Sequence, residues 1–259
     1  MAFFMPLKDE YLEVARRNAR FLLENLYQDG RLLRSWRDGQ DGGRAQHNGY
    51  LEDYASLILG LLALYQSDPD PVWYTEALKL ADEMVSHFSD ESVGFFDTRD
   101  DHETLLFRPK DIQDNATPSG NSLAASVLIQ LSAYGDRPEW RKLAEQMLAA
   151  NQDMIARFPS AFSQWLCAVD WVVGPHGEVA IIGDLAEPQT KIFTGTLWSK
   201  YRPRLVTAVS PDPAWEGSPG LVKDRPKIGE MTTAYVCQGF VCKQPVNSPQ
   251  ELVVQLEEL

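Results

Sequence analysis

The stretch from Arg108 to Tyr134 reads RPKDIQDNATPSGNSLAASVLIQLSAY and joins a long polar loop to a strongly apolar segment. Residues 108–122 hold two prolines, a glycine and several acid or amide side chains, with no hydrophobic run. Residues 122–134 are strongly apolar, which is typical of a helix that packs against the rest of the protein on at least one face. The pattern therefore predicts a buried helix whose N-terminus receives a polar loop, and this loop is either an elaborate cap or a ligand site.

The same arrangement recurs along the first two thirds of the chain. Amphipathic helices are predicted at 10–28, 72–88 and 139–158, and each precedes a more apolar helix, at 50–65, 122–134 and 160–173. The starts of the amphipathic helices repeat roughly every 60 to 70 residues, as expected of stacked helical hairpins. We therefore expect a mainly α protein in which residues 1–174 form three hairpins of a partial α/α toroid. Three hairpins make half of the usual ring, so we expect a homodimer or a missing N-terminal half-toroid to complete it, unless the C-terminal region covers the open edges.

The C-terminal region has a different pattern. Residues 175–259 alternate short β-branched runs with helical segments, which predicts a small α/β region. Strands are expected at 177–184, 204–210 and 232–242, helices at 186–201 and 248–259, and an irregular loop rich in proline and glycine at 211–230.

Composition limits the classes of partner. The chain has 44% hydrophobic and 24% charged residues and a net charge of −13. This charge predicts a soluble protein that binds neither nucleic acid nor an anionic membrane. The opening MAFFMPLKDE lacks a basic region and a cleavage site, so we expect a cytoplasmic protein. The sequence contains no phosphate-binding or dinucleotide-binding motif and no metal-ligand spacing, so we expect no cofactor and no metal, and a small-molecule ligand as partner.

The long connections 29–49 and 89–119 both lead from an amphipathic helix into an apolar one, so the N-termini of the apolar helices should share one end of the molecule. Helix N-termini favour negative charge and polar ligand groups. Acid–base candidates at this end are Glu52, Asp53, Asp114, His47 and His102. Candidates for substrate binding are Tyr50, Tyr54, Arg108, Thr117, Ser119 and Asn121.

Each candidate also has an ordinary interpretation. Acids in the first turn of a helix complement its dipole, Ser119 or Thr117 can cap a helix, and a single histidine is most often a surface residue. Under the functional interpretation, carboxylates accept sugar hydroxyls or transfer protons, and tyrosines stack on a sugar face.

Two of the three cysteines, Cys237 and Cys242, flank the turn QGFV and are predicted to face each other across a hairpin. Opposed strand residues lie near the distance that a disulfide needs, which makes the pair a redox candidate. In a reducing compartment two free thiols are the commoner state, and we expect the reduced pair.

Three segments resemble a known family: YLEDYASLILGLLALYQ (50–66), GFFDTRDDHETLLFRPKDIQDNATPSGNSLAA (94–125) and TAYVCQGFVCKQPVNSPQEL (233–252). Together they are similar to the C-terminal half of the spermatogenesis-associated protein 20 family, whose bacterial members are called thioredoxin-domain-containing proteins. The resemblance implies a toroid of the six-hairpin glycosidase type, similar to N-acylglucosamine 2-epimerases, which follows a thioredoxin-like domain that this sequence lacks.

The resemblance predicts a carbohydrate-related protein, with epimerase-like or glycosidase-like chemistry if it is an enzyme. The paired histidines of the epimerases match no motif here. The alternative is a non-catalytic module that binds a ligand or a protein and works with a thioredoxin-like partner domain.

Overall fold

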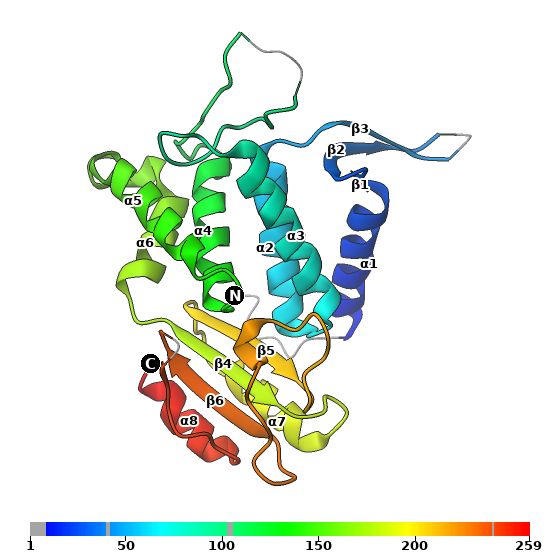
Figure 1. The fold of residues 1–259 in the computed structure, drawn as a ribbon, viewed down its shortest axis with the longest axis vertical. Coiled ribbons are helices and arrows are strands. Elements are labelled where there is room, and N and C mark those ends of the chain that lie inside the picture. The colour runs from blue at the N-terminus through cyan, green and yellow to red at the C-terminus, as the bar shows by residue number, and fades with distance from the viewer. Residues whose placement is uncertain (1–8, 40–41, 103–105, 240) are drawn as a thin grey trace.

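The computed structural model describes residues 9–39, 42–102, 106–239 and 241–259 (Figure 1). Its helices are α1 (Asp9–Asn25), α2 (Leu51–Ser67), α3 (Pro71–Phe88), α4 (Gly120–Ala133), α5 (Glu139–Arg157), α6 (Ser163–Val173), α7 (Pro188–Leu197) and α8 (Pro249–Glu257), with short 3-10 turns η2 (Pro159–Ala161) and η3 (Gly220–Val222). Its strands are β1 (Tyr27–Gln28), β2 (Arg31–Arg37), β3 (Arg44–Asn48), β4 (Gly177–Ile182), β5 (Leu205–Ser210), β6 (Thr233–Gln238) and β7 (Val241–Cys242).

The first six helices form the predicted alternation of apolar and amphipathic helices. The apolar helices α2, α4 and α6 are neighbours in that order, while α3 packs on α2 and α5 packs on α4. Twelve of the fourteen residues of α4 are buried, which explains its apolar character on all sides. Within the described residues, eight α-helices are accompanied by two small sheets, so the strand content is larger than a mainly helical prediction implies.

The connection at 29–49 was expected to be a long loop, and the structure corrects this to a β-hairpin. Strands β2 and β3 pair antiparallel, with Leu33 opposite Asn48 and Trp36 opposite Ala45, and β1 extends the sheet. Four of the seven residues of β2, RLLRSWR, are arginine or serine. These polar residues hide the alternation of apolar side chains that usually indicates a strand. Trp36 contacts the ring of Phe21 edge-on at 5.6 Å, which docks the hairpin on α1.

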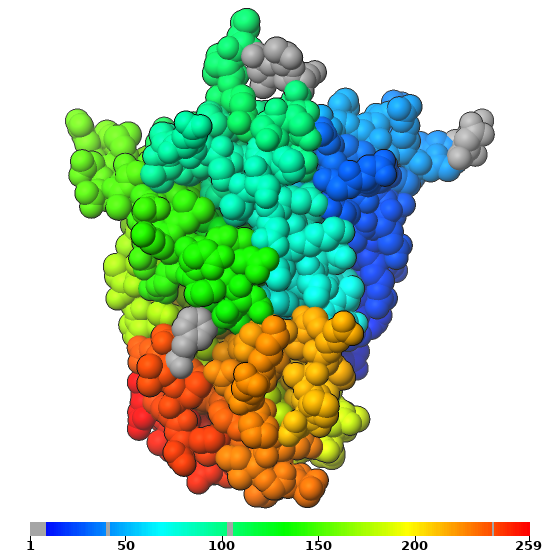
Figure 2. All heavy atoms as spheres, viewed as in Figure 1, coloured from blue at the N-terminus to red at the C-terminus, as the bar shows by residue number. Residues whose placement is uncertain are grey.

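The C-terminal sheet has the strand order β5-β4-β6-β7, with β4 parallel to β5 and antiparallel to β6. Successive residues of a strand point to opposite faces. Ala180 and Ile182 of β4 belong to the core of the helices, whereas Val179 and Ile181 pack in a second core with residues of α7 and α8. The sheet is therefore covered on both faces, and the C-terminal region lies directly against one end of the helices (Figure 2).

The polar loops gather at the other end of the molecule. The N-terminus of α2 and that of α4 lie far from the C-terminal sheet, together with the β2–β3 hairpin and the loop 89–119 (Figure 1). None of the described helices has the length and apolar character that crossing a bilayer would require.

Candidate functional site

The loop that precedes α4 is held together by its own side chains, beginning with Asp114. This carboxylate is 7% exposed. Its Oδ1 accepts from the backbone N–H of Ser119 at 2.9 Å and from the hydroxyl of Ser122 at 2.7 Å, and its Oδ2 accepts from the N–H of Gln164 at 2.8 Å. One side chain thus binds the N-termini of both α4 and α6. The predicted cap is also present, since the Ser119 hydroxyl accepts from the Ser122 N–H at 3.2 Å.

Asn121 and Arg108 tie the same loop to the segment before it. The buried amide of Asn121 accepts from the N–H of Phe95 and donates to the Phe95 carbonyl, both at 2.9 Å. Arg108 donates to the carbonyls of His87 and Thr98, and its guanidinium lies 4.1 Å from the centre of the Phe96 ring. These two candidates for substrate binding therefore bond to the protein itself.

A second group of polar residues meets where the hairpin, the loop 89–119 and the start of α2 come together. We call it the Tyr50 cluster, and it consists of Arg34, Tyr50, Glu52, Asp53, Asp97 and His102. The Arg34 guanidinium lies 4.7 Å from the centre of the Tyr50 ring, and its nitrogens are 3.2 Å from Glu52 and 3.5 Å from Asp53. The His102 ring stacks on Tyr50 with centroids 5.9 Å apart. The cluster brings together four of the residues proposed from sequence.

Two backbone contacts fix the cluster at the N-terminus of α2. The Asp53 carboxylate accepts from the N–H of Tyr50 at 2.8 Å, and the Asp97 carbonyl accepts from the N–H of Leu51 at 2.9 Å. The two carboxylate oxygens of Asp97 both accept from the N–H of Asp111, at 3.1 and 3.0 Å. The Asp53 carboxylate is therefore held at the start of its own helix, and the Asp97 carboxylate is held by the backbone of Asp111.

Burial governs the electrostatics of this cluster. The pKa of Asp53 is raised, chiefly because burial disfavours the charged form, although the Tyr50 N–H and Arg34 act in the opposite direction. The pKa of Asp97 is also raised, first by burial and then by the negative charges of Asp111 and Glu52. Two carboxyl groups at one helix end thus retain protons more strongly than a carboxyl group in water.

His102 adds an imidazole to the same cluster. Its Nδ1 is enclosed and has no hydrogen-bond partner among the residues that the structure describes. A buried polar atom without a partner is unfavourable, so this nitrogen is available to bond to a ligand or to an ordered water.

Three further candidates lie outside both the Tyr50 cluster and the bonded loop before α4. Tyr54 is fully buried, and its hydroxyl accepts from the N–H of Leu32 at 2.9 Å and from Arg99 at 3.0 Å. A buried ring cannot stack on a ligand, so the expected stacking role of Tyr54 does not fit the structure. Thr117 is exposed on the loop, and His47 is exposed on β3 with a φ of 61°.

Sequence reasoning missed Arg34 and Asp97 of this cluster. Arg34 lies in the unrecognised hairpin, and only the correct strand assignment would have placed it beside α2. Asp97 lies in the segment GFFDTR, where a single acid between aromatic and polar residues gives no periodic signal.

One group of side chains has the geometry of a possible cation site. The ligand atoms of His87, Asp100 and Asp101 lie within 4.8 Å of one another. Asp101 is 2.6 Å from Arg31 and 3.0 Å from Arg99, so two guanidinium groups already neutralise it. These residues are bonded as an ion-pair network, and His87 lies 2.8 Å from Asp100.

The cysteine prediction is confirmed in one part and corrected in another. Cys237 of β6 and Cys242 of β7 are directly paired across the hairpin, as expected. The structure joins them in a disulfide, whereas reduced thiols were expected. The expectation rested on the compartment, and the geometry of the strand pair brings the two sulfurs close enough to bond.

The fold and the site together define a largely helical protein with two small sheets and an acidic, aromatic cluster at the N-terminus of a buried helix. The chain is related to spermatogenesis-associated protein 20, as the sequence resemblance predicted. It is 29% identical to the human protein over 95% of this chain and 30% identical to the rat protein over 92%. These matches cover 33% and 32% of the relatives, so the chain spans about a third of their length. No protein-family model matches it.

Proposed function

We propose that the Tyr50 cluster binds a small neutral polyhydroxy ligand of the carbohydrate class. The observation that carries the proposal is the meeting of two carboxyl groups of raised pKa, Asp53 and Asp97, with the partly exposed ring of Tyr50. Carboxyl groups exchange hydrogen bonds with sugar hydroxyls. The Tyr50 ring, which already packs with Arg34 and His102, offers the ligand its hydroxyl and the part of its surface that stays exposed. The enclosed Nδ1 of His102 supplies a further polar contact.

The same groups suit acid–base chemistry. A carboxyl group with a raised pKa keeps its proton at a pH where an ordinary carboxyl has lost it, which is the requirement for a general acid. Glu52 has a side chain that is 45% exposed and is the least protected carboxylate of the cluster. We assign the proton-donating role to Asp53 or Asp97 and ligand contact to Glu52, in an epimerase-like or glycosidase-like reaction.

The proposal is tested by nuclear magnetic resonance titration with neutral mono- and disaccharides. We expect shifts confined to amides around Tyr50 and His102, a loss of at least about tenfold in affinity for Y50A, corresponding to about 1.4 kcal/mol, and a weaker loss for D53N. T117A is the matched control, because Thr117 is exposed on the neighbouring loop. Absence of localised shifts across the whole sugar set would refute the proposal.

The second candidate function is a non-catalytic module, and it is favoured by the exposed side of α6. Leu166 is 40% exposed and Val173 is 76% exposed, on the helix at the end of the buried row. We infer that the row α2, α4 and α6 is half of an α/α toroid whose other half comes from a helical segment outside these 259 residues. The human relative is about three times as long as the matched region, so proteins of this kind contain further sequence that could supply such a segment.

Under this alternative the cluster binds a ligand or a protein segment, and a thioredoxin-like partner domain performs any chemistry. The sugar titration separates the two functions. Binding without any turnover of the bound sugar favours the module, whereas turnover that D53N or D97N abolishes favours the enzyme.

A further inference from the structure

Cys237 and Cys242 lie at the edge of the C-terminal sheet, at the end of the molecule opposite to the Tyr50 cluster. The disulfide joins two positions that differ sharply in exposure. Cys237 is 1% exposed, whereas Cys242 lies on the exposed edge strand β7. An attacking thiol can therefore reach one sulfur and not the other.

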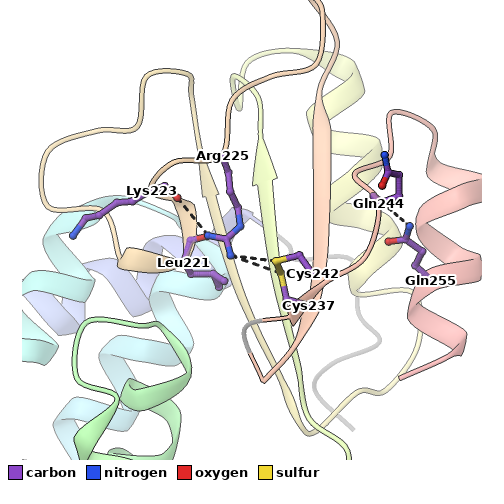
Figure 3. The surroundings of a disulfide bond; sticks show 7 residues. All are labelled: Leu221, Lys223, Arg225, Cys237, Cys242, Gln244 and Gln255. Carbon is purple, nitrogen blue, oxygen red and sulfur yellow. Dashed lines mark hydrogen bonds between the residues drawn. A yellow bond between two sulfur atoms is a disulfide. The ribbon is translucent and has the colours of Figure 1, made fainter.

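Arg225 is directed at this disulfide from the loop 211–230 (Figure 3). Its Nη1 donates to the carbonyls of Leu221 and Lys223, which holds the guanidinium in place. Its Nη2 lies 3.3 Å from the Sγ of Cys242 and 3.7 Å from the Sγ of Cys237. The cation is thus fixed by two backbone oxygens and faces both sulfurs.

The position of this cation favours the reduced, ionised form of the pair. A disulfide is uncharged and a weak acceptor, so the guanidinium gains little from it. A thiolate carries a full negative charge and is stabilised by a neighbouring arginine. The partial burial of Arg225 lowers its pKa, while the guanidinium of arginine stays protonated in proteins.

Other charged or titratable groups surround the pair. Glu178 of β4 is paired in register with Cys237 and is fully buried, with its Oε1 3.4 Å from His176. The Tyr235 ring lies 5.9 Å from the guanidinium carbon of Arg225. Among the described groups, Arg225 is the cation that contacts the sulfurs.

We propose that Cys237 and Cys242 form a thiol–disulfide exchange site for a thiol or dithiol partner, with Arg225 as the residue that stabilises the released thiolate. A partner thiolate attacks the Sγ of Cys242 and forms a mixed disulfide. The bond between the two cysteine sulfurs breaks, and its electron pair leaves on the Sγ of Cys237 beside Arg225.

The second half of the exchange completes the balance. A second thiolate, on the same dithiol or on a second molecule of a monothiol partner, attacks the partner sulfur in the mixed disulfide and releases Cys242 as a thiolate. The partner is oxidised to a disulfide by two electrons, the cysteine pair is reduced by two electrons, and the two protons of the partner dithiol pass to the two cysteines or to water. In the reverse direction a disulfide partner oxidises the reduced cysteine pair and is itself reduced to thiols.

The test uses the full chain carrying C167S, because Cys167 is a third, exposed cysteine. The protein is equilibrated with glutathione buffers of known ratio, and the reduced fraction is measured by maleimide labelling and mass spectrometry. We expect R225Q to shift the equilibrium constant about tenfold toward the disulfide, the factor that one pKa unit represents. R202Q is the matched control, since Arg202 is also partly buried and donates to a backbone carbonyl, that of Leu197 at 2.8 Å.

A second measurement keeps the proposal falsifiable if R225Q does not fold. In the reduced C167S protein, thiolate absorbance at 240 nm should give at least one midpoint below the value of about 8.5 for a free cysteine. A first midpoint at or above that value would overturn the proposal. An equilibrium constant for R225Q within twofold of that for R202Q would do the same, as would a pair that stays reduced in oxidised glutathione.

Discussion

Replacing Asp114 by alanine should destabilise the protein by about 3 to 5 kcal/mol, because the substitution leaves buried donors without an acceptor. The carboxylate accepts from the N–H of Ser119, the hydroxyl of Ser122 and the N–H of Gln164. The Ser122 hydroxyl keeps a second acceptor, the Ser119 carbonyl at 2.9 Å. Two backbone N–H groups remain, and a stranded buried donor costs about 1 to 3 kcal/mol, with loss of the capping charge adding to this sum.

The assay is urea unfolding followed by far-ultraviolet circular dichroism. D114N keeps one acceptor oxygen, and we expect it to lose about half as much stability as D114A. N115A is the matched control, because Asn115 is exposed beside Asp114, and it should change stability by less than about 0.5 kcal/mol. A loss below about 1 kcal/mol for D114A would show that the carboxylate does not hold the two helices, and would return it to the candidates for catalysis.

Two further predictions concern Asp97 and the side of α6. Burial raises the pKa of Asp97 above its ordinary value of 3.8, so its contribution to stability is present below that pH and is lost as the pH rises through the folded pKa. The stability of the wild type relative to D97N should therefore fall as the pH rises above about 3.8 in parallel urea titrations, and a constant difference would contradict the assignment. The isolated chain should associate at micromolar concentration through Leu166 and Val173, with L166D/V173D restoring a monomer of 29.2 kDa in light scattering. A monomeric wild type would show that this side needs no cover.

The helices could be predicted from sequence because their apolar residues follow the helical period. The first apolar helix was expected at 50–65 and is found at Leu51–Ser67, and the cap at Ser119 follows from a serine before a helix start. The convergence of α2 and α4 at one end was predictable as well, because each follows a long connection from an outer helix. The toroid itself stays a proposal.

The sequence could not predict which polar side chains form hydrogen bonds within the protein instead of facing a ligand. Asn121 bonds to both backbone groups of Phe95, which is 26 residues away, and no local pattern announces such a pairing. A polar loop rich in amides and acids has the same composition whether its side chains face a ligand or close the loop. The hairpin at β2 and β3 escaped detection because arginines occupy the positions where an alternating strand would show apolar residues.

The two faces of the C-terminal sheet have a consequence for how this chain can vary. One face, with Ala180 and Ile182 of β4, is part of the same interior as the helices, and the other is closed by α7 and α8. The hydroxyl of Tyr134 at the end of α4 reaches the Thr207 carbonyl of β5 at 3.4 Å, and the N–H of Leu221 bonds to the Tyr134 carbonyl at 2.8 Å. The sheet thus contributes side chains to both hydrophobic cores. Neither the helical region nor the C-terminal region can be exchanged for an unrelated domain unless the side chains that face it in the remaining region are also changed.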